Sequence, residues 1–214
     1  ALSPAEFEAA ANETRCVVLD TRSNQEFAKG FVPKSINIGI EGDFAPWVGT
    51  IIVDVKQPIL LITDLGKEEE SVTRLSRVGF DNILGHLKGG FDAWKNEGRE
   101  IDTVNRITAT QFAQEVKIGE SQVIDIRKDG EYSAEHVEEA YNKPLAYINN
   151  WIKDINPDQH FYLHCAGGYR SMIAASILQS RGYRNFSEIE GGFNEIAKTN
   201  LPLTDFVCQS KVLK

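Results

Sequence analysis

The chain contains one residue pattern twice, and this repeat constrains its fold more than any other feature. Four polar residues of the first half recur 105 positions later: Asp20 as Asp125, Arg22 as Arg127, Glu26 as Glu131 and Asn37 as Asn142. A Gly-Gly-Phe triplet at 89–91 recurs at 191–193. The period is longer than the roughly 20–45 residues of stacking solenoid repeats. The 214 residues therefore predict two copies of one domain.

The boundary between the copies is expected within residues 97–108, a polar segment without periodicity. We place the first domain at 1–102 and the second at 103–214. Each copy opens with a helix start signal. Ser3 followed by Pro4 predicts a cap and the first helical position, and Thr108 with Gln111 has the spacing of a capping box.

Short apolar runs alternate with helical stretches in both copies. The runs are 16–20, 58–64 and 82–85 in the first copy, and 122–127, 160–165 and 185–190 in the second. Such alternation is typical of parallel strands that are covered on both faces. The predicted fold class is α/β, with two domains that each hold a mainly parallel sheet of about five strands and helices on both faces.

Composition narrows the functions that the chain can have. The net charge of -8 argues against nucleic-acid and anionic-membrane partners. No apolar run reaches the roughly 18 residues of a membrane span, and the first residues do not resemble a signal peptide. Three cysteines form no disulfide framework, so a reducing compartment, the cytoplasm, is expected. The chain begins without methionine, which favours a processed form or a piece of a longer protein.

One cysteine lies at a junction between a strand and a helix. Residues 160–165 predict a buried strand and 171–182 predict a helix, so Cys165 to Arg170 form the turn between them. Ligands of open α/β sheets bind at the carboxyl ends of the strands. The turn is therefore expected at the binding edge of its sheet.

The composition of this turn favours a reactive thiolate. Gly167 and Gly168 allow successive backbone N–H groups to point inward, and such a nest at a helix N-terminus holds an anion. With Cys165 at its centre, the anion is the thiolate itself, and Arg170 adds a cation that lowers the thiol pKa. The turn therefore predicts a nucleophilic Cys165.

Cys165 has two other possible roles, as a core residue and as a metal ligand. A buried cysteine that only packs in the core is common, with the glycines simply making the turn. A metal site would use His160, His164 and Cys165, but residues 164 and 165 of a strand point to opposite faces and further ligands are missing. We expect no metal and no organic cofactor.

The second copy resembles a rhodanese domain over nearly its whole length. The segments that carry the resemblance are "VIDIRKDGEYSAEHVEEAYNKPL", "CAGGYRS" and "GYRNFSEIEGGFNEI". The resemblance implies a sulfurtransferase in which Cys165 takes a sulfane sulfur and carries it as a persulfide. It implies a cradle from the loop residues, which are Ala166, Gly167, Gly168, Tyr169, Arg170 and Ser171. It implies supporting roles for Asp125, Arg127 and His136.

Loop length distinguishes two chemistries among proteins that this copy resembles. The related cell-cycle phosphatases have five residues between cysteine and arginine, whereas residues 166–169 make four here. The shorter loop favours sulfur transfer from thiosulfate or a low-molecular-weight persulfide to a thiol, sulfite or cyanide. A cysteine-dependent phosphatase or arsenate reductase, and a non-catalytic docking module, remain the alternatives.

The first copy lacks the cysteine. Aligned by sequence, Asp64 stands in the place of Cys165, Lys67 or Glu69 in that of Arg170, and Phe31 in that of His136. An aspartate cannot carry sulfur. The first copy is therefore predicted to be inactive and to pack against, orient or gate the second.

The order of an inactive and an active copy, with the segment 38–49, also resembles the C-terminal part of certain fusion proteins. In these, a metallo-β-lactamase-fold persulfide dioxygenase with non-haem iron precedes two rhodanese copies. The four histidines of this chain include no H-x-H-x-D-H cluster, so such a domain would lie outside it. The expected partners are a small-molecule sulfur donor and acceptor, and that oxidising domain.

Overall fold

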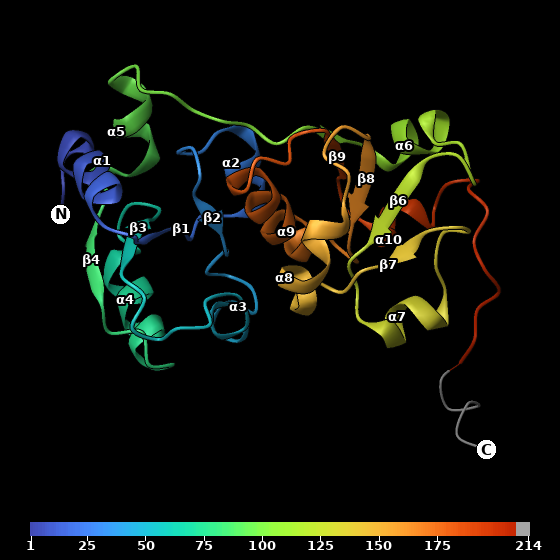
Figure 1. Cartoon of the computed structure of the whole chain (residues 1–214), viewed down its shortest axis with the longest axis horizontal. Coiled ribbons are helices and arrows are strands. Elements are labelled where there is room, and N and C mark those ends of the chain that lie inside the picture. Colours follow the sequence, from blue (N-terminus) through green and yellow to red (C-terminus); the bar gives the residue numbers. More distant parts are fainter. Residues whose placement is uncertain (209–214) are drawn as a thin grey trace. The chain divides into compact units, whose positions relative to one another are not determined.

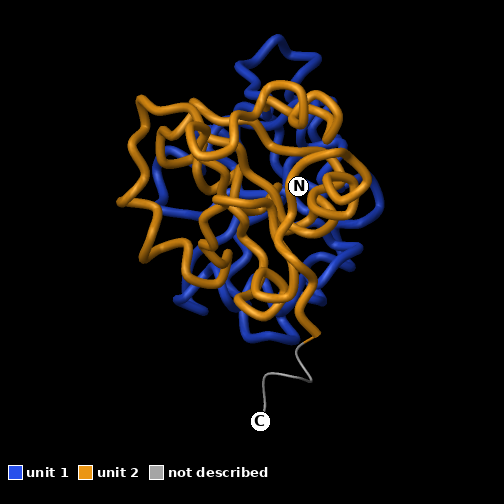
Figure 2. Tube along the Cα trace, turned by 90° about the vertical axis from the view of Figure 1, so that its right-hand side faces the viewer, with its two compact units in different colours: residues 1–104 blue, residues 105–214 orange. Residues whose placement is uncertain are grey.

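The computed structural model describes residues 1–208 and divides the chain into two compact units (Figure 2). Unit 1 comprises 1–104 and unit 2 comprises 105–214. The division falls two residues beyond the boundary that we placed at 102. Residues 209–214 of the predicted second domain lie outside the described part of the chain.

Each unit has one parallel sheet (Figure 1). The unit 1 sheet has the order β2-β1-β3-β4, with strands β1 (Val17–Asp20), β2 (Ile36–Asn37), β3 (Ile59–Ile62) and β4 (Ile83–His86). The unit 2 sheet has the order β5-β9-β8-β6-β7, with strands β5 (Arg106–Ile107), β6 (Gln122–Asp125), β7 (Tyr141–Asn142), β8 (Phe161–His164) and β9 (Phe186–Ile189). The predicted α/β class is confirmed.

Helices connect the strands in both units. Those of unit 1 are α1 (Pro4–Glu13), α2 (Asn24–Lys29), α3 (Phe44–Ile51), α4 (Glu68–Ser76) and α5 (Gly90–Asn96). Those of unit 2 are α6 (Ala109–Glu115), α7 (Asp129–Ala134), α8 (Ile148–Trp151), α9 (Tyr169–Ser180) and α10 (Phe193–Ile196), with short 3-10 turns at Leu145–Tyr147 and Ile152–Asp154. Both predicted helix starts are confirmed, because α1 and α6 each carry a complete capping box.

The sheets differ by one strand for a local reason. In unit 2, β5 pairs with β9, and Ile107 faces Ile189. At the matching place in unit 1, Leu2 forms only a single bridge with Leu87. The expectation of about five strands therefore holds for unit 2, whereas unit 1 has four. The segment 97–108, which we predicted to be irregular, contains β5.

Helices cover both faces of the unit 2 sheet. α6 and α10 cover one face through a cluster that includes Phe112, Tyr162 and Phe193. α9 packs against β8 and β9 on the other face. α1 and α5 of unit 1 cover the face that carries Leu60 and Ile62. α4 connects β3 to β4 as α9 connects β8 to β9.

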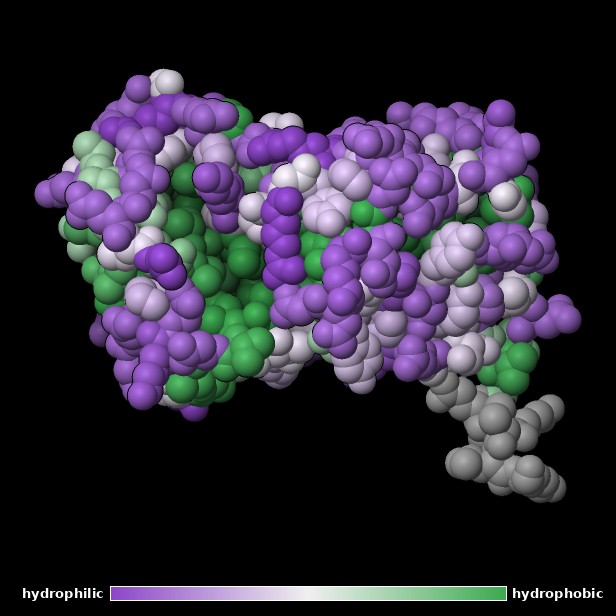
Figure 3. All heavy atoms as spheres, in the orientation of Figure 1, coloured by the Kyte–Doolittle hydropathy of each residue, from purple (hydrophilic) through white to green (hydrophobic). Residues whose placement is uncertain are grey.

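Among the residues that the structure describes, more large hydrophobic side chains are exposed in unit 1 than in unit 2. Figure 3 shows hydrophobic surface over unit 1, while the face of unit 2 in the same view is mostly hydrophilic. The exposed members in unit 1 include Val53, Val55, Leu65, Val72, Val78, Leu84 and Ile101. Among residues 1–208, no helix is both long and apolar enough to cross a membrane.

Candidate functional site

Cys165 follows β8 directly and lies beneath its loop. Its side chain is 1% exposed, and the backbone N–H of Gly168 donates to its Sγ at 3.1 Å. Gly168 adopts φ +97°, a conformation that favours glycine, and it forms the N-cap of α9. The helix thus begins at Tyr169, two residues before the predicted start. The sulfur therefore sits at the N-terminus of a 12-residue helix, where the helix dipole and free N–H groups favour an anion.

A second glycine-containing segment holds this loop in place. The N–H of Phe193 donates to the carbonyl oxygen of Cys165 at 2.7 Å, and that of Asn194 donates to Ala166 at 3.0 Å. This approach requires Gly192, because a Cβ there would lie 2.3 Å from the Cys165 carbonyl oxygen. Gly192 also has φ +57° and ψ -148°, a region that only glycine populates readily.

Arg170 is engaged by a carboxylate. Its two terminal nitrogens donate to Glu131 at 2.6 and 2.7 Å, in a bidentate pair. These hydrogen bonds are the largest cause of the raised pKa of Arg170. The attraction between Arg170 and Cys165 raises this pKa further. The same hydrogen bonds lower the pKa of Glu131. Arg170 was predicted as a cation beside Cys165, and the pair with Glu131, which neutralises part of this charge, was not predicted from the sequence.

Two buried residues that the sequence analysis did not connect lie behind Cys165. The Sγ of Cys165 is 3.4 Å from the Ser171 hydroxyl oxygen, and this hydroxyl donates to Glu188 at 2.5 Å. Arg106 donates to the other oxygen of Glu188 at 2.6 Å. Glu188 lies on β9 and is fully buried. The sequence held one signal for this contact, because Glu188 is an acidic residue inside the predicted buried strand 185–190.

The three supporting residues fall into two places. The buried pair of Asp125 and Arg127 has its shortest contact at 2.6 Å, and the guanidinium of Arg127 stacks over Phe193 at 3.9 Å. This pair therefore braces the segment that holds the loop. His136 stacks on Tyr132 and contacts Thr204, so the structure places it in a different cluster from the Cys165 loop.

His164 lies just before the cysteine and is fully buried. Its Nδ1 contacts the carbonyl oxygen of Cys165 at 3.2 Å, and its Nε2 has no partner among the described residues. Burial lowers the pKa of His164, which favours the neutral ring. His160 contacts Ser187 instead. In residues 1–208, no group of three histidine, cysteine or acidic side chains is arranged to hold a metal.

Comparison with known proteins shows which family the two units belong to. A model of the rhodanese-like domain matches residues 3–97 and again residues 108–199. The chain belongs to the rhodanese-like domain family. Both units match it separately, which agrees with the repeat in the sequence and with the two parallel sheets.

The relatives carry several names. The uncharacterized protein YqhL of Bacillus subtilis is 32% identical over 92 residues, covering 42% of this chain and 73% of that protein. The thiosulfate sulfurtransferase GlpE of Vibrio cholerae is 26% identical, covering 45% of this chain and 90% of that protein. The tRNA uridine(34) hydroxylase of Photorhabdus laumondii is 27% identical, covering 43% of this chain and 28% of that protein.

Among solved structures, a thiosulfate sulfurtransferase from Pseudomonas aeruginosa aligns with 96% of this chain. Its TM-score is 0.42 and its sequence identity is 18%. This chain spans 43% of that protein.

Register within the two rhodanese-like sheets identifies the residue that replaces Cys165 in unit 1. Asp125 pairs with His164, and Asp20 pairs with Ile62. The residue after Ile62 is Thr63, and Gly90 packs on its carbonyl oxygen as Gly192 packs on that of Cys165. The prediction that Asp64 replaces the cysteine is therefore wrong by one position. Sequence alignment placed the gap in the wrong part of the loop.

Two other predicted equivalences follow from hydrogen bonds. Arg127 donates to the carbonyl oxygen of Glu135 and Arg22 to that of Gly30, so the following residues, His136 and Phe31, are equivalent as predicted. The turns that follow α4 and α9 each contain a glycine with positive φ, Gly79 and Gly182. Counting back twelve positions from these two glycines, Lys67 takes the place of Arg170. Its ammonium group contacts Glu70 and Glu41.

The rhodanese-like loop of unit 1 borders an acidic pocket of about 280 Å³. Its lining includes Thr63, Asp64, Glu26 and Asp92, with Arg22. Arg22 is already paired with Asp20 at 2.6 Å. The pocket therefore has a negative character that disfavours an anionic sulfur donor.

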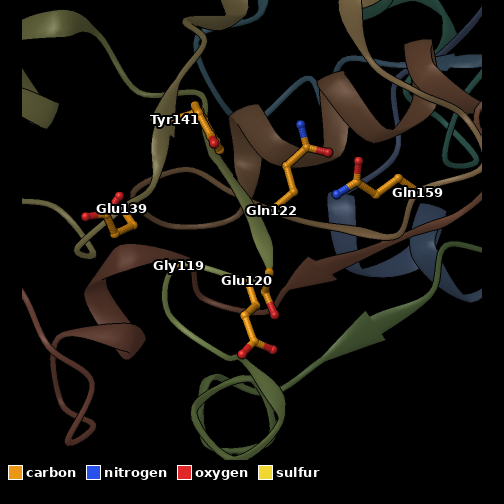
Figure 4. A pocket seen from close by; sticks show the side chains of 7 residues that line it. Gly119, Glu120, Gln122, Glu139, Tyr141 and Gln159 are labelled. Carbon is orange, nitrogen blue, oxygen red and sulfur yellow. The ribbon is translucent and has the colours of Figure 1, made fainter.

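Unit 2 has a further polar pocket at the opposite edge of its sheet (Figure 4). Gln122 and Tyr141 begin strands β6 and β7, and Gln159 precedes β8. The volume is about 160 Å³, and the polar lining also includes Glu120, Ser121 and Glu139. Because Cys165 follows the carboxyl end of β8, this pocket is separate from the cysteine loop.

Proposed function

We propose that the chain is a sulfurtransferase in which Cys165 carries a persulfide. The thiolate of Cys165 attacks the outer sulfur of thiosulfate or of a small persulfide. A new S–S bond forms at Cys165, the S–S bond of the donor breaks, and sulfite or a thiolate leaves with the electron pair. A thiol, sulfite or cyanide then attacks the terminal sulfur, and Cys165 leaves as thiolate. Two displacements replace one difficult transfer.

The observation that carries this proposal is the position of the Cys165 sulfur at the N-terminus of α9. The Gly168 N–H donates to it, and four residues separate it from Arg170. A negative sulfur is stabilised in such a place. The loop residues Ala166 to Ser171 form the cradle, and Asp125 and Arg127 support the segment that holds it. Gly167 is exposed and marks the side from which a donor approaches.

Unit 1 has no sulfur carrier under this proposal. Thr63 has no thiol, and its pocket is lined by carboxylates. Unit 1 then serves to pack against, orient or gate unit 2. A reducing compartment such as the cytoplasm suits an enzyme whose thiol must stay free. A persulfide-oxidising domain of the metallo-β-lactamase fold is the partner that the sequence resemblance favours, and its addition should accelerate persulfide consumption by this chain.

Intact-mass measurement before and after thiosulfate, and separately with glutathione persulfide, tests the proposal. Wild-type protein is expected to gain one sulfur atom that cyanide removes, and Cys165→Ser is expected to gain none. Loading of a residue in unit 1 of Cys165→Ser would contradict the inactive role of that unit. No gain with either donor would refute the carrier and favour a docking module.

A cysteine-dependent phosphatase is the second candidate, because the same fold supports it with a wider loop. The four-residue spacing between Cys165 and Arg170, and the bidentate use of Arg170 by Glu131, disfavour a phosphate in the loop. Turnover of an aryl phosphate that depends on Cys165 would overturn this judgement.

A further inference from the structure

A line of hydrogen bonds leads from the reactive sulfur into the interior of unit 2. The Cys165 thiol donates to Ser171 Oγ at 3.4 Å, and the Ser171 hydroxyl donates to Glu188 Oε1 at 2.5 Å. Cys165 is 1% exposed, and Ser171 and Glu188 are 0% exposed. Bulk water therefore has little access to these three groups, and the carboxylate is the acceptor at the end of the line.

We infer that Glu188 is the internal proton acceptor for Cys165, and that Ser171 relays the proton. The thiol proton moves to Ser171 Oγ while the hydroxyl proton of Ser171 moves to Glu188 Oε1. The products are a Cys165 thiolate, an unchanged serine and a neutral carboxyl group on Glu188. The reverse transfer restores the thiol after the sulfur has been passed on. The inference rests on the proposed function, since it explains how the nucleophile forms.

The charges around the line set its proton affinity. Arg106 on β5 donates to Glu188 Oε2 at 2.6 Å, and its other end lies 3.7 Å from Glu190. On the loop side, Arg170 is paired with Glu131, and its attraction to Cys165 raises its pKa further. Burial raises the pKa of Glu188, against the opposing effect of Arg106 and Ser171. A carboxyl with a raised pKa accepts a proton more readily than an exposed one.

A purely structural carboxylate would give the thiol a different titration. A fixed negative charge near Cys165 repels the thiolate and raises the thiol pKa. Removing that charge favours the thiolate in either role, so it speeds the reactions of the thiolate near neutral pH. A carboxylate that stays ionised leaves the thiol a single-step titration, whereas a carboxyl that takes up the thiol proton gives two coupled steps with a pH-independent interval between them. The shape of the pH profile therefore separates the two roles.

The same line is absent where the cysteine is absent. Leu163 pairs with Glu188 in unit 2, and Leu61 pairs with His86 at the matching place in unit 1. Thr63 and His86 thus occupy the positions of Cys165 and Glu188. The acidic group and the thiol occur together in one unit, and neither occurs at these positions in the other.

The experiment measures the alkylation rate of Cys165 by iodoacetamide between about pH 5 and pH 9 in the full chain. Peptide mass spectrometry separates this cysteine from Cys16 and Cys208. The wild type is expected to show an interval of about one pH unit in which the alkylation rate changes little, because the thiol proton then moves to Glu188 and not to bulk water. Glu188→Gln should replace this interval by a single step and should be alkylated up to roughly tenfold faster at its upper pH limit. Ser171→Ala should weaken the coupling and narrow the interval, and the double variant should behave as Glu188→Gln does, because both changes break one relay.

Glu190→Gln is the matched control. Its carboxylate also lies near Arg106, but its side chain is 57% exposed and the line does not include it. Its pH profile is expected to match that of the wild type. This control separates loss of the relay from a general loss of charge beside Arg106.

A single-step profile in the wild type, or an unchanged interval in Glu188→Gln, would overturn the relay. An unchanged interval in Ser171→Ala would overturn it as well, even if Glu188→Gln fails to fold. Absence of any alkylation of wild-type Cys165 would also overturn it, since no thiolate would form. Normal alkylation without sulfur loading would refute only the proposed function. Sulfur loading with unaffected variants would refute only the relay.

Discussion

The two units share the same frame and differ in the residues that it presents. The Asp20–Arg22 and Asp125–Arg127 pairs each have a shortest contact of 2.6 Å, and each guanidinium stacks over the phenylalanine of the Gly-Gly-Phe segment. At the end of the neighbouring strand, unit 1 has Thr63 and unit 2 has Cys165.

This difference shows that the residues that hold the loop in place are distinct from the residue that the loop presents. The buried ion pair and the glycine segment position the turn after the central strand, whichever residue stands there. Under the proposed function, reactivity requires the thiol of Cys165 with Ser171 and Glu188, and unit 1 has Thr63 and His86 at the positions of Cys165 and Glu188. The fold alone therefore does not make either unit a sulfur carrier.

Substitution of the second glycine of each Gly-Gly-Phe segment should have the largest effect on stability, and the effect should differ between the two units. Gly192→Ala is expected to destabilise unit 2 by about 3 kcal/mol, because it adds backbone strain and a 2.3 Å contact with the Cys165 carbonyl oxygen. Gly90→Ala, with a 3.0 Å contact to Thr63, should destabilise unit 1 by about 2 kcal/mol. Urea unfolding followed by hydrogen exchange of β8 and β3 amides measures both. Equal losses would show that the two segments are held equally tightly.

Acid should weaken the two units unequally. His164 is buried with a pKa below 6.5, and unit 1 has Ile62 at this position. The unfolded chain takes up a proton below about pH 6.5 and the folded chain does not. Unit 2 therefore keeps its full stability above this pH and loses up to about 1.4 kcal/mol per pH unit below it.

His164→Ile should flatten this slope. Thermal unfolding of the full chain from pH 8 to pH 5 provides the measurement, with pH 8 as the internal reference because the histidine is neutral there in both states. His160, which burial also lowers in pKa, should leave a small residual slope. An unchanged slope in the variant would assign the acid sensitivity to other groups.

The smallest expected effect concerns the matched glutamates of the two units. Glu131 makes a bidentate pair with Arg170, whose side chain is 17% exposed, whereas Glu26 pairs with the exposed Lys29. Glu131→Gln should destabilise unit 2 by about 1 kcal/mol, and Glu26→Gln should leave unit 1 unchanged. The midpoint of urea unfolding of each unit is the readout. A larger loss from Glu26→Gln would reverse our assignment of the structural pair.

The sequence was sufficient to predict the two-domain organisation and the parallel α/β class. The repeated residues lie at equivalent structural positions, and alternating apolar runs locate the main strands. It also placed Cys165 at the end of a strand and before a helix. These features depend on local pattern and on spacing, which a sequence displays directly.

Tertiary contacts explain what the sequence did not predict. Glu188 approaches Ser171 only because β9 lies beside β8, and Glu131 reaches Arg170 from a helix 39 positions away. Thr63 was missed as the counterpart of Cys165 because loop residues have no periodicity that fixes a gap. Strand register supplied that missing reference.

Gly192 lies 27 positions beyond the cysteine, yet its neighbours Phe193 and Asn194 hold the carbonyl groups of Cys165 and Ala166. The structural unit of the Cys165 turn is therefore larger than the turn itself. A graft of the six residues 165–170 into another member of the fold would carry the cysteine without the segment that holds its carbonyl group. Transfer of this turn in its present conformation requires both segments together.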